Sequence, residues 1–283
     1  MAILDRITIG NQEIAIIDSN PSGLDLQEGS IASDKNGRGI FYKYGTNNTD
    51  WNKIAQSNSK VIHVQETGGD FTSIVAALAS ITDNGINNRY VINVSGIFTE
   101  SLIDLSAKPY VSIAGDTINS TVIKPTTSTQ HIIKIGEMNE VSFLTIEGAG
   151  SGYAGVYCND GGEFAQLHKV SIIDCDICVL IENNTVDTQV YLEYVDFAGV
   201  YSYGIKVINS GAGLLFVNAE NQYSFNDSGL LCTYCVQGAN SLLEILTSGN
   251  EASGGTANGV ELHSGATVNI MSAYFTGYNK AFY

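Results

Sequence analysis

The sequence predicts an all-β protein, a right-handed single-stranded parallel β-helix with an N-terminal capping helix, preceded by a small β-rich N-terminal module. Two observations lead to this prediction. A phrase of apolar, polar, apolar, apolar and small residues recurs about every 20 to 30 residues, and a second strand-like segment follows most copies. One copy cannot bury its apolar face alone, so a repeat of this kind is typical of a stacked coil.

The first-strand phrase has eight copies, and its apolar residues are expected to form the core of successive coils. The copies begin at Val91, Val111, Val141, Val170, Leu192, Leu214, Leu243 and Val268. In several copies two neighbouring positions are apolar, as in Phe143-Leu144 and Tyr194-Val195. Alternate residues of a straight strand face opposite sides. We therefore expect either a bend there or one column in a subunit contact, with Tyr194 in the core.

The second-strand segments occur at matching spacing from residue 131 onward. They are Ile132–Ile135, Gly155–Cys158, Cys178–Ile181, Gly204–Val207, Gly229–Cys232, Gly259–Leu262 and Lys280–Tyr283. Two alternating strands per coil favour a parallel β-helix, because a propeller needs about four strands in each blade of about 40 residues. The last copy ends at Tyr283, so we expect a partner chain to cover it or the chain to continue.

Residues 1–58 are predicted to form a separate module, joined to the β-helix by a polar linker. Ile3–Ile17 alternates as a strand or hairpin, and Asn36-Gly37 is a strong hairpin-turn signal. Three phrases in this module resemble the N-terminal regions of bacteriophage tail-fibre, tailspike and other virion appendage proteins. They are Gly29-Ser30-Ile31, Phe41-Tyr42-Lys43-Tyr44-Gly45, and Thr49-Asp50-Trp51 with Ile54. The resemblance implies attachment to other virion proteins; the alternative is a β-rich cap.

Residues 61–283 are predicted to form the β-helix, of which 61–125 are the cap and first rungs. Val61–Gln65 is strand-like, and Asp70 is a plausible N-cap for an amphipathic helix of about 12 residues. Ile74, Leu78 and Ile81 lie at helical spacing in that segment. A helix across the first coil would cover its unpaired backbone and open core.

This stretch resembles the pectin-lyase-like superfamily, most closely pectin methylesterases. The resemblance lies in Gly69–Ile74, Tyr90–Val94 and Val111–Asp116. It implies the capped parallel β-helix. The family's later catalytic motifs are missing: Val195-Asp196-Phe197 matches one of them in three letters, and no arginine follows Arg89. Methylesterase and lyase chemistry are therefore not predicted.

Charge and hydropathy exclude several classes of partner. The net charge is −16, with only 13 Lys and Arg residues and no basic run. Nucleic acids and anionic membranes bind through cationic contacts, so we expect neither partner. The first ten residues lack a signal peptide's apolar region, and no apolar stretch could span a bilayer. We expect assembly in the host cytoplasm and a place in the virion.

The cysteines could bind metal or fill the core. The five cysteines include two Cys-x-x-Cys pairs, Cys175–Cys178 and Cys232–Cys235. Together they would make a four-thiolate zinc site. However, the pairs fall two rungs apart, on the order of 10 Å, and Cys158 and Cys232 are assigned to one column. We therefore predict stacked core or turn cysteines, with no metal and no cofactor.

Two carboxylates give the strongest catalytic candidate. Asp174 and Asp196 are assigned to successive rungs and would approach at roughly 5 Å, with Glu193 nearby and outward-facing. Such a pair suits glycoside cleavage. The alternative is a ladder of polar turn residues, favoured because Thr145 and Asn218 occupy the same assigned column. No catalytic or binding residue is assigned.

Aromatic residues and histidines are the remaining side chains that could contact a ligand. The tyrosines of the middle rungs could contact sugars from an outer face, or else fill the core: Tyr191, Tyr194, Tyr201, Tyr203 and Tyr223. The histidines fall on different rungs without a nucleophile at motif spacing, and are treated as incidental: His63, His131, His168 and His263.

The function predicted first is that of a non-enzymatic bacteriophage virion protein, a tail or head fibre or spike that attaches to the bacterial surface. By family resemblance it would be a homotrimer, bound to other virion proteins through residues 1–58, with a host surface glycan as a candidate ligand. One alternative is a tailspike depolymerase that hydrolyses host polysaccharide, with Asp174, Asp196 and Glu193 as candidates. Another is a cell-surface glycan-binding protein.

Overall fold

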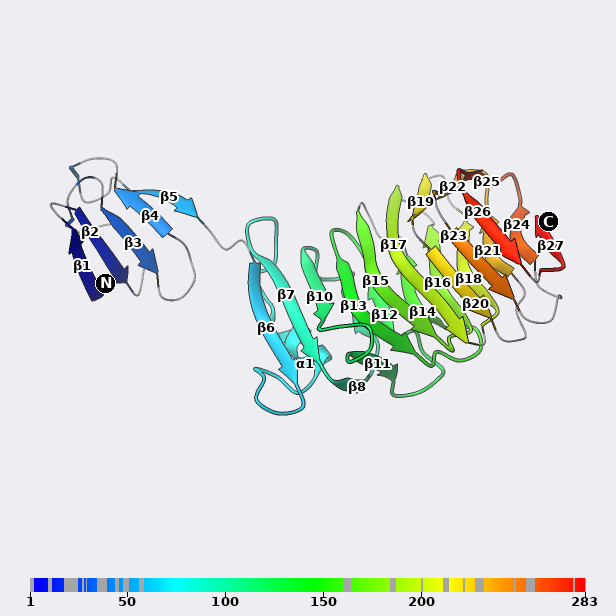
Figure 1. Ribbon diagram of the computed structural model, residues 1–283, viewed down its shortest axis with the longest axis horizontal. Helices are drawn as coiled ribbons and strands as arrows, with labels where there is room; N and C mark the ends of the chain where they lie inside the picture. The colour runs from blue at the N-terminus through cyan, green and yellow to red at the C-terminus, as the bar shows by residue number, and fades with distance from the viewer. Residues whose placement is uncertain are drawn as a thin grey trace. The chain divides into compact units, whose positions relative to one another are not determined.

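A computed structural model divides the chain into two compact units, Met1–Lys60 and Val61–Tyr283 (Figure 1). Each unit is described by itself. The described residues are 3–9, 12–17, 25–26, 28, 30–34, 40–43, 46–47, 51–55, 59–159, 164–183, 187–199, 201–210, 214–220, 222–226, 232–246, 248–252, 258–276 and 278–282.

The first unit is a five-stranded sheet in the order β1-β2-β3-β4-β5. The strands are Ile3–Ile9, Gln12–Ile17, Ile31–Asp34, Ile40–Lys43 and Trp51–Ala55. Neighbours pair antiparallel except β2 and β3, which are parallel. Ala15, Ile17, Leu26 and Ala32 form its small buried core. The Asn36-Gly37 turn and part of the virion-like phrases lie outside the described residues.

The second unit is a parallel β-helix whose strands stack side by side in successive coils (Figure 1), and the strand pairing divides it into three faces. The first face contains β6 (Ser59–Gln65), β7 (Arg89–Ser95), β10 (Val111–Gly115), β13 (Glu140–Glu147), β15 (Ala165–Ile173), β17 (Thr188–Gly199), β19 (Leu215–Glu220), β22 (Ser241–Ile245) and β25 (Thr267–Ile270). The predicted parallel β-helix is confirmed.

The second face was not predicted from the repeat. It contains β8 (Ile97–Glu100), β11 (Val122–Pro125), the C-terminal parts of β13, β15 and β17, and then β20 (Gln222–Asn226), β23 (Ser248–Ala252) and β26 (Ala273–Thr276). In the middle rungs one long strand serves both faces, since β13 pairs with β10 and then with β11. A single copy of the repeat phrase in these rungs therefore belongs to a strand that lies on two faces.

The third face is the eight-stranded sheet that contains the predicted second strands. Its members are β9 (Ile103–Asp104), β12 (Ile133–Ile135), β14 (Ala154–Asn159), β16 (Ile177–Asn183), β18 (Tyr203–Asn209), β21 (Cys232–Gln237), β24 (Asn258–His263) and β27 (Lys280–Phe282). Among the described residues, the strand pairs whose register the structure gives in this unit are parallel, as for β7 with β10 and β18 with β21.

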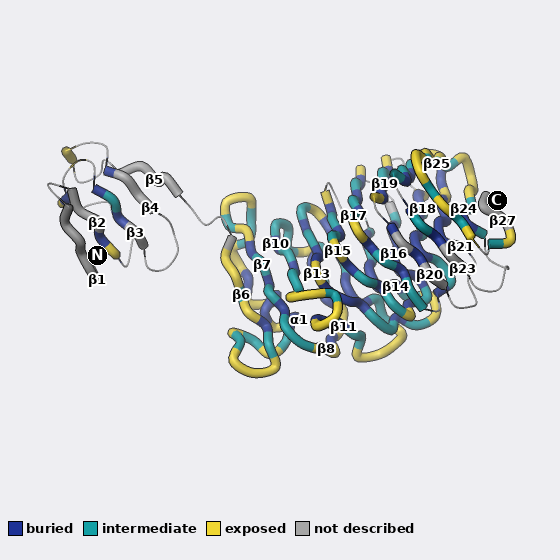
Figure 2. The backbone as a smooth tube through the Cα atoms, viewed as in Figure 1, coloured by how far each residue is buried: buried dark blue, intermediate teal, exposed yellow. Residues whose placement is uncertain are grey.

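Inward-facing side chains stack in columns from rung to rung and form one continuous core. Ile113 pairs with Val141, Val141 with Leu167, and Leu167 with Leu192, and each side chain is at most 1% exposed. Burying one such side chain contributes about 1.5–3 kcal/mol. Buried and more exposed residues alternate along the strands (Figure 2), so neighbouring outward residues also form columns.

The capping helix is shorter than predicted. Helix α1 spans Ile74–Ser80, and Ser73 is its N-cap, with Oγ accepting from the Ala76 amide at 3.2 Å. Glu100 assists by accepting from the Ile74 amide at 2.6 Å. Asp70 instead accepts from the His63 amide at 2.8 Å, so the predicted N-cap is wrong. The helix starts later because Ser73 and Glu100 satisfy its first amides. Among the described residues, no helix is long and apolar enough to cross a membrane.

Candidate functional site

The long strands of the middle rungs bend at one shared position. Phe143, Lys169 and Tyr194 have φ values of 57°, 52° and 53°. The residues before and after them are paired between rungs, so the three occupy equivalent positions on β13, β15 and β17. Left-handed backbone costs about 1–2 kcal/mol for a residue with a side chain. Strain of this kind clusters at functional sites.

This bend explains the doubled apolar positions in the repeat. Leu144 and Val195 are fully buried, whereas Phe143 and Tyr194 are 37% and 47% exposed. The expectation of a bend is confirmed, and the assignment of Tyr194 to the core is wrong. The left-handed residue turns its side chain outward, so two successive apolar residues face opposite environments.

A glycine on the preceding rung makes room for the bend. A Cβ on Gly115 would lie 2.4 Å from the Phe143 carbonyl oxygen and 2.9 Å from the Leu144 Cβ. Real Cβ atoms do not approach backbone that closely, so a side chain here would displace the bend. Gly115 ends β10 at the point where the next rung turns.

The outward column at the bend combines aromatic and charged groups. The Lys169 ammonium lies 5.4 Å from the Phe143 ring centroid and 5.8 Å from that of Tyr194, which are cation–π distances. His168 meets both rings edge-on, at 5.4 and 6.1 Å. Its Nδ1 lies 3.0 Å from the Glu193 carboxylate. His168 is therefore not incidental, because rung stacking gives it partners that no linear motif shows.

Phe143, Lys169 and Tyr194 line a groove of about 270 Å³, here named the bend groove. Its lining comprises Asp116, Thr117, Ile118, Phe143, Lys169, Val170, Tyr194 and Asp196. The loop after β10 forms one side, and the Thr145 hydroxyl anchors it by donating to the Ile118 carbonyl. Burial raises the pKa of the half-buried Asp196 above its ordinary value.

The predicted pairing of Asp174 with Asp196 is wrong. Asp196 pairs with Ser171, whereas Ile173 pairs with Ala198, which places Asp174 level with Gly199. The Asp174 amide donates to the Ala198 carbonyl at 3.1 Å. The repeat predicts that Val170 lies level with Val141, but Val170 pairs with Leu144. Because the bend residue interrupts strict alternation, the apolar pattern did not fix the register.

The other predicted tyrosines have different environments. Tyr191 stacks on Phe164 at 5.9 Å beside a second hollow of about 400 Å³, which Gln166 and Asn218 also line. Tyr201 is buried in the core at 1% exposure, so sugar contact at Tyr201 is ruled out. Tyr203 lies beneath Lys206, and the Tyr223 side chain lies outside the described residues.

The two Cys-x-x-Cys pairs differ in their surroundings. Cys175 and Cys178 belong to the core, and burial raises the pKa of Cys175 to about 11. Cys158 pairs with Ile181, whereas Cys232 pairs with Tyr203, so their predicted shared column is wrong. The predicted segment Gly229–Cys232 is displaced from the observed strand, because β21 begins at Cys232 and Tyr234 pairs with Ile205.

Comparison with known proteins found similarity at the level of structure. No protein-family model and no curated protein matches the chain. A pectin methylesterase variant solved with a hexasaccharide is similar over 74% of this chain and 80% of its own, with TM-score 0.46 and 14% identity. The pectin methylesterase PemA from Erwinia chrysanthemi is similar over 76% and 82%, with TM-score 0.45 and 13% identity. ORF18 of Geobacillus virus E2 is similar over 96% and 74%, with TM-score 0.42 and 12% identity.

These comparisons correct the prediction that the chain is not an enzyme. Proteins with the same β-helix fold are enzymes, so the fold gives no ground for excluding catalysis. At 12–14% identity the likeness shows the fold alone, and tailspike identity does not follow from it. The prediction relied on missing linear motifs, whereas a β-helix assembles sites from residues on successive rungs.

Proposed function

We propose that this chain is a bacteriophage virion protein that binds a neutral polysaccharide of the bacterial surface in the bend groove. The observation that carries this proposal is the exposed column of Phe143, Lys169 and Tyr194 at a strained bend. Exposed aromatic faces offer apolar contact to sugar rings, and the Tyr194 hydroxyl and Lys169 ammonium offer hydrogen bonds. The successive rungs present these groups at the strand spacing of about 4.8 Å, which suits an extended polymer.

The charge of the groove favours a neutral polymer. Asp116 and Asp196 line it together with a single cation, Lys169. The whole chain carries a net charge of −16, which repels acidic polymers over distances up to about 10 Å at moderate salt. Residues 1–58 would attach the chain to the virion, as their resemblance to appendage modules implies.

An array of purified capsular, O-antigen and teichoic-acid glycans tests the binding. We expect Phe143→Ala and Tyr194→Ala each to weaken binding to the best neutral glycan about tenfold, which corresponds to about 1.4 kcal/mol. Tyr274→Ala is the matched control, because Tyr274 is 60% exposed on β26 and does not line the groove. Binding to no glycan, or equal loss in the control, would contradict the proposal.

A second candidate function is hydrolysis of the bound polysaccharide. Asp196 favours it, because its burial raises the carboxyl pKa and Asp116 lines the same groove. A protonated Asp196 would donate to the glycosidic oxygen while Asp116 activates water, which adds across the broken bond. Asp196→Asn should abolish release of new reducing ends and keep binding. Unchanged release, or none from the wild type, would exclude this activity.

The assembly is proposed to be a homotrimer. Light scattering of the whole chain should then give about three times 30.2 kDa. A monomer would remove this part of the proposal without affecting the groove, because all of its lining residues belong to one chain.

A further inference from the structure

The third face has its own bend, where outward residues at positions i and i+3 of each strand touch. Ile177 and Leu180 belong to one small apolar cluster. On the next rung, the Lys206 ammonium lies 4.4 Å from the Tyr203 ring centroid. Two rungs further on, the Asn258 side-chain amide donates to Glu261 at 2.7 Å. Between these rungs, the same two positions are occupied by Cys232 and Cys235.

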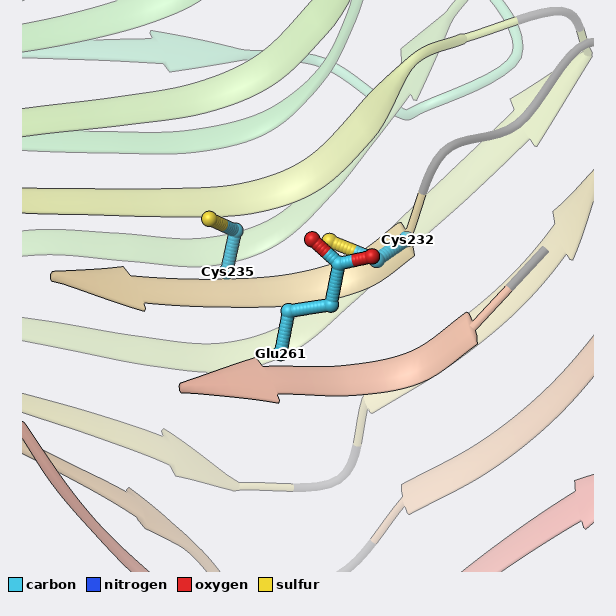
Figure 3. Close-up of side chains that lie close together, drawn as sticks. All are labelled: Cys232, Cys235 and Glu261. Carbon is cyan, nitrogen blue, oxygen red and sulfur yellow. The ribbon is translucent and has the colours of Figure 1, made fainter. Parts of the chain in front are cut away.

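Cys232, Cys235 and Glu261, here named the thiol cluster, converge at this bend. Two thiols from β21 and the carboxylate from β24 lie close together, as Figure 3 shows. One ligand atom from each lies within 4.8 Å of the others. In a tetrahedral zinc site, two sulfur ligands are separated by roughly 3.8 Å, given Zn–S bonds of about 2.3 Å. Closure of the thiol cluster around an ion therefore needs only small side-chain shifts.

The surroundings of the thiol cluster contain a second indication of a cation. Within the part of the chain that the structure describes, the buried Oδ1 of Asn258 has no hydrogen-bond donor. Asn258 is the strand partner of Cys232, and its amide nitrogen holds the Glu261 carboxylate. A buried oxygen acceptor without a donor is costly. A nearby cation would offset that cost electrostatically.

The position of His263 completes the arrangement. Its Nε2 lies 3.6 Å from the second carboxylate oxygen of Glu261, on the more exposed side of the thiol cluster. Metal-ligating carboxylates are commonly held by such outer partners. Cys232 is fully buried and Cys235 is 5% exposed, so the thiols face a largely dry space.

We propose that Cys232, Cys235 and Glu261 form a binding site for a thiophilic divalent cation of the zinc type. The mixed thiolate and carboxylate ligands, within reach of an imidazole, match the donors that zinc prefers. The burial of the thiols makes it a structural site that joins β21 to β24. The four-thiolate site considered from the sequence does not form, because Cys175 and Cys178 belong to the core.

Titration of the whole reduced chain with Co²⁺ tests this proposal. We expect one Co²⁺ per chain, with the charge-transfer absorption of thiolate-bound cobalt, which Zn²⁺ then displaces. Cys235→Ser should remove this absorption, and Glu261→Gln should weaken binding at least tenfold. Cys175→Ala is the control matched for thiol number, because Cys175 lies in the core, and it should bind like the wild type.

Three outcomes would overturn the proposal. The first is no thiolate absorption in the wild type, and the second is an equal loss of that absorption in Cys175→Ala. The third is a Cys232–Cys235 disulfide, in protein purified without reductant, that accounts for both thiols. Thermal unfolding of the metal-free variants shows whether each has folded. If Cys235→Ser does not fold, Glu261→Gln alone decides the question.

Discussion

Two regions of the β-helix, the strained bend between the first and second faces and the thiol cluster on the third face, gather side chains for different ends. At the bend between the first and second faces, the outward column of Phe143, Lys169 and Tyr194 is exposed and borders a groove. In the thiol cluster, Cys232 and Cys235 are buried. In both places rung stacking gathers unlike side chains that are distant in sequence. Because the first column is exposed, it can bind a polymer. The buried thiols have room only for an ion.

The thiol cluster should give the largest change in stability. Zn²⁺ at 100 times its Kd should stabilise the wild type by about 2.7 kcal/mol, because it binds only the folded chain. Urea unfolding with and without Zn²⁺ measures this gain. The gain should vanish in Cys235→Ser and persist in Cys175→Ala; a gain that survives in both would place the metal elsewhere.

The stability of the bend beside the groove should depend on the absence of a side chain at Gly115. Gly115→Ala should destabilise the chain by about 1–3 kcal/mol, because its Cβ would meet the Phe143 carbonyl. Gly85→Ala is the control, since no atom lies within 4 Å of its added Cβ, and it should be near neutral. Chemical denaturation compares the two. Equal effects would mean that the bend does not depend on that close approach.

Replacing the central residue of the groove column should separate stability from binding. Lys169→Gly should stabilise the chain by about 1 kcal/mol, because glycine adopts a φ of 52° without strain. The same change removes the ammonium and should weaken glycan binding. Thermal unfolding and the glycan array together check both halves. A destabilised variant that binds normally would refute the view that backbone strain is retained there for function.

Asp196 should make stability depend on pH. Burial raises its pKa in the folded chain above the ordinary value of 3.8. Protonation of Asp196 therefore favours the folded state, and this contribution is complete at pH values below 3.8. That contribution is lost as pH rises through the raised folded pKa. Unfolding measured across this range should show the loss in the wild type and a flatter profile in Asp196→Asn. Parallel profiles would contradict the burial of this carboxyl.

The smallest effect is expected at the ion pair beside the groove. Glu193→Gln should cost less than about 1 kcal/mol, because the Glu193 side chain is 38% exposed and water screens its contact with His168. A larger loss of stability would show that the pair anchors the bend. A weakening of glycan binding without loss of stability would instead extend the binding site to His168.

The sequence predicted the parallel β-helix because its apolar columns repeat, but it did not predict the register. The left-handed residues interrupt alternation, so the repeat places Val170 level with Val141, whereas it pairs with Leu144. That shift paired Asp174 with Asp196. It also hid the contacts of His168 and Lys169, which depend on neighbouring rungs. The assignment of Tyr194 to the core has another cause: its alignment with Phe143 is correct, but the bend turns both side chains outward. Positive φ at a residue with a side chain leaves no compositional signal that separates it from an ordinary strand residue.

The most direct test of the central claim is a crystal structure of the whole chain with the neutral oligosaccharide that binds best on the array. The account predicts sugar rings packed against Phe143 and Tyr194, with a hydroxyl near Asp196. An oligosaccharide seated instead on the Phe164–Tyr191 stack, with the bend groove open, would contradict it.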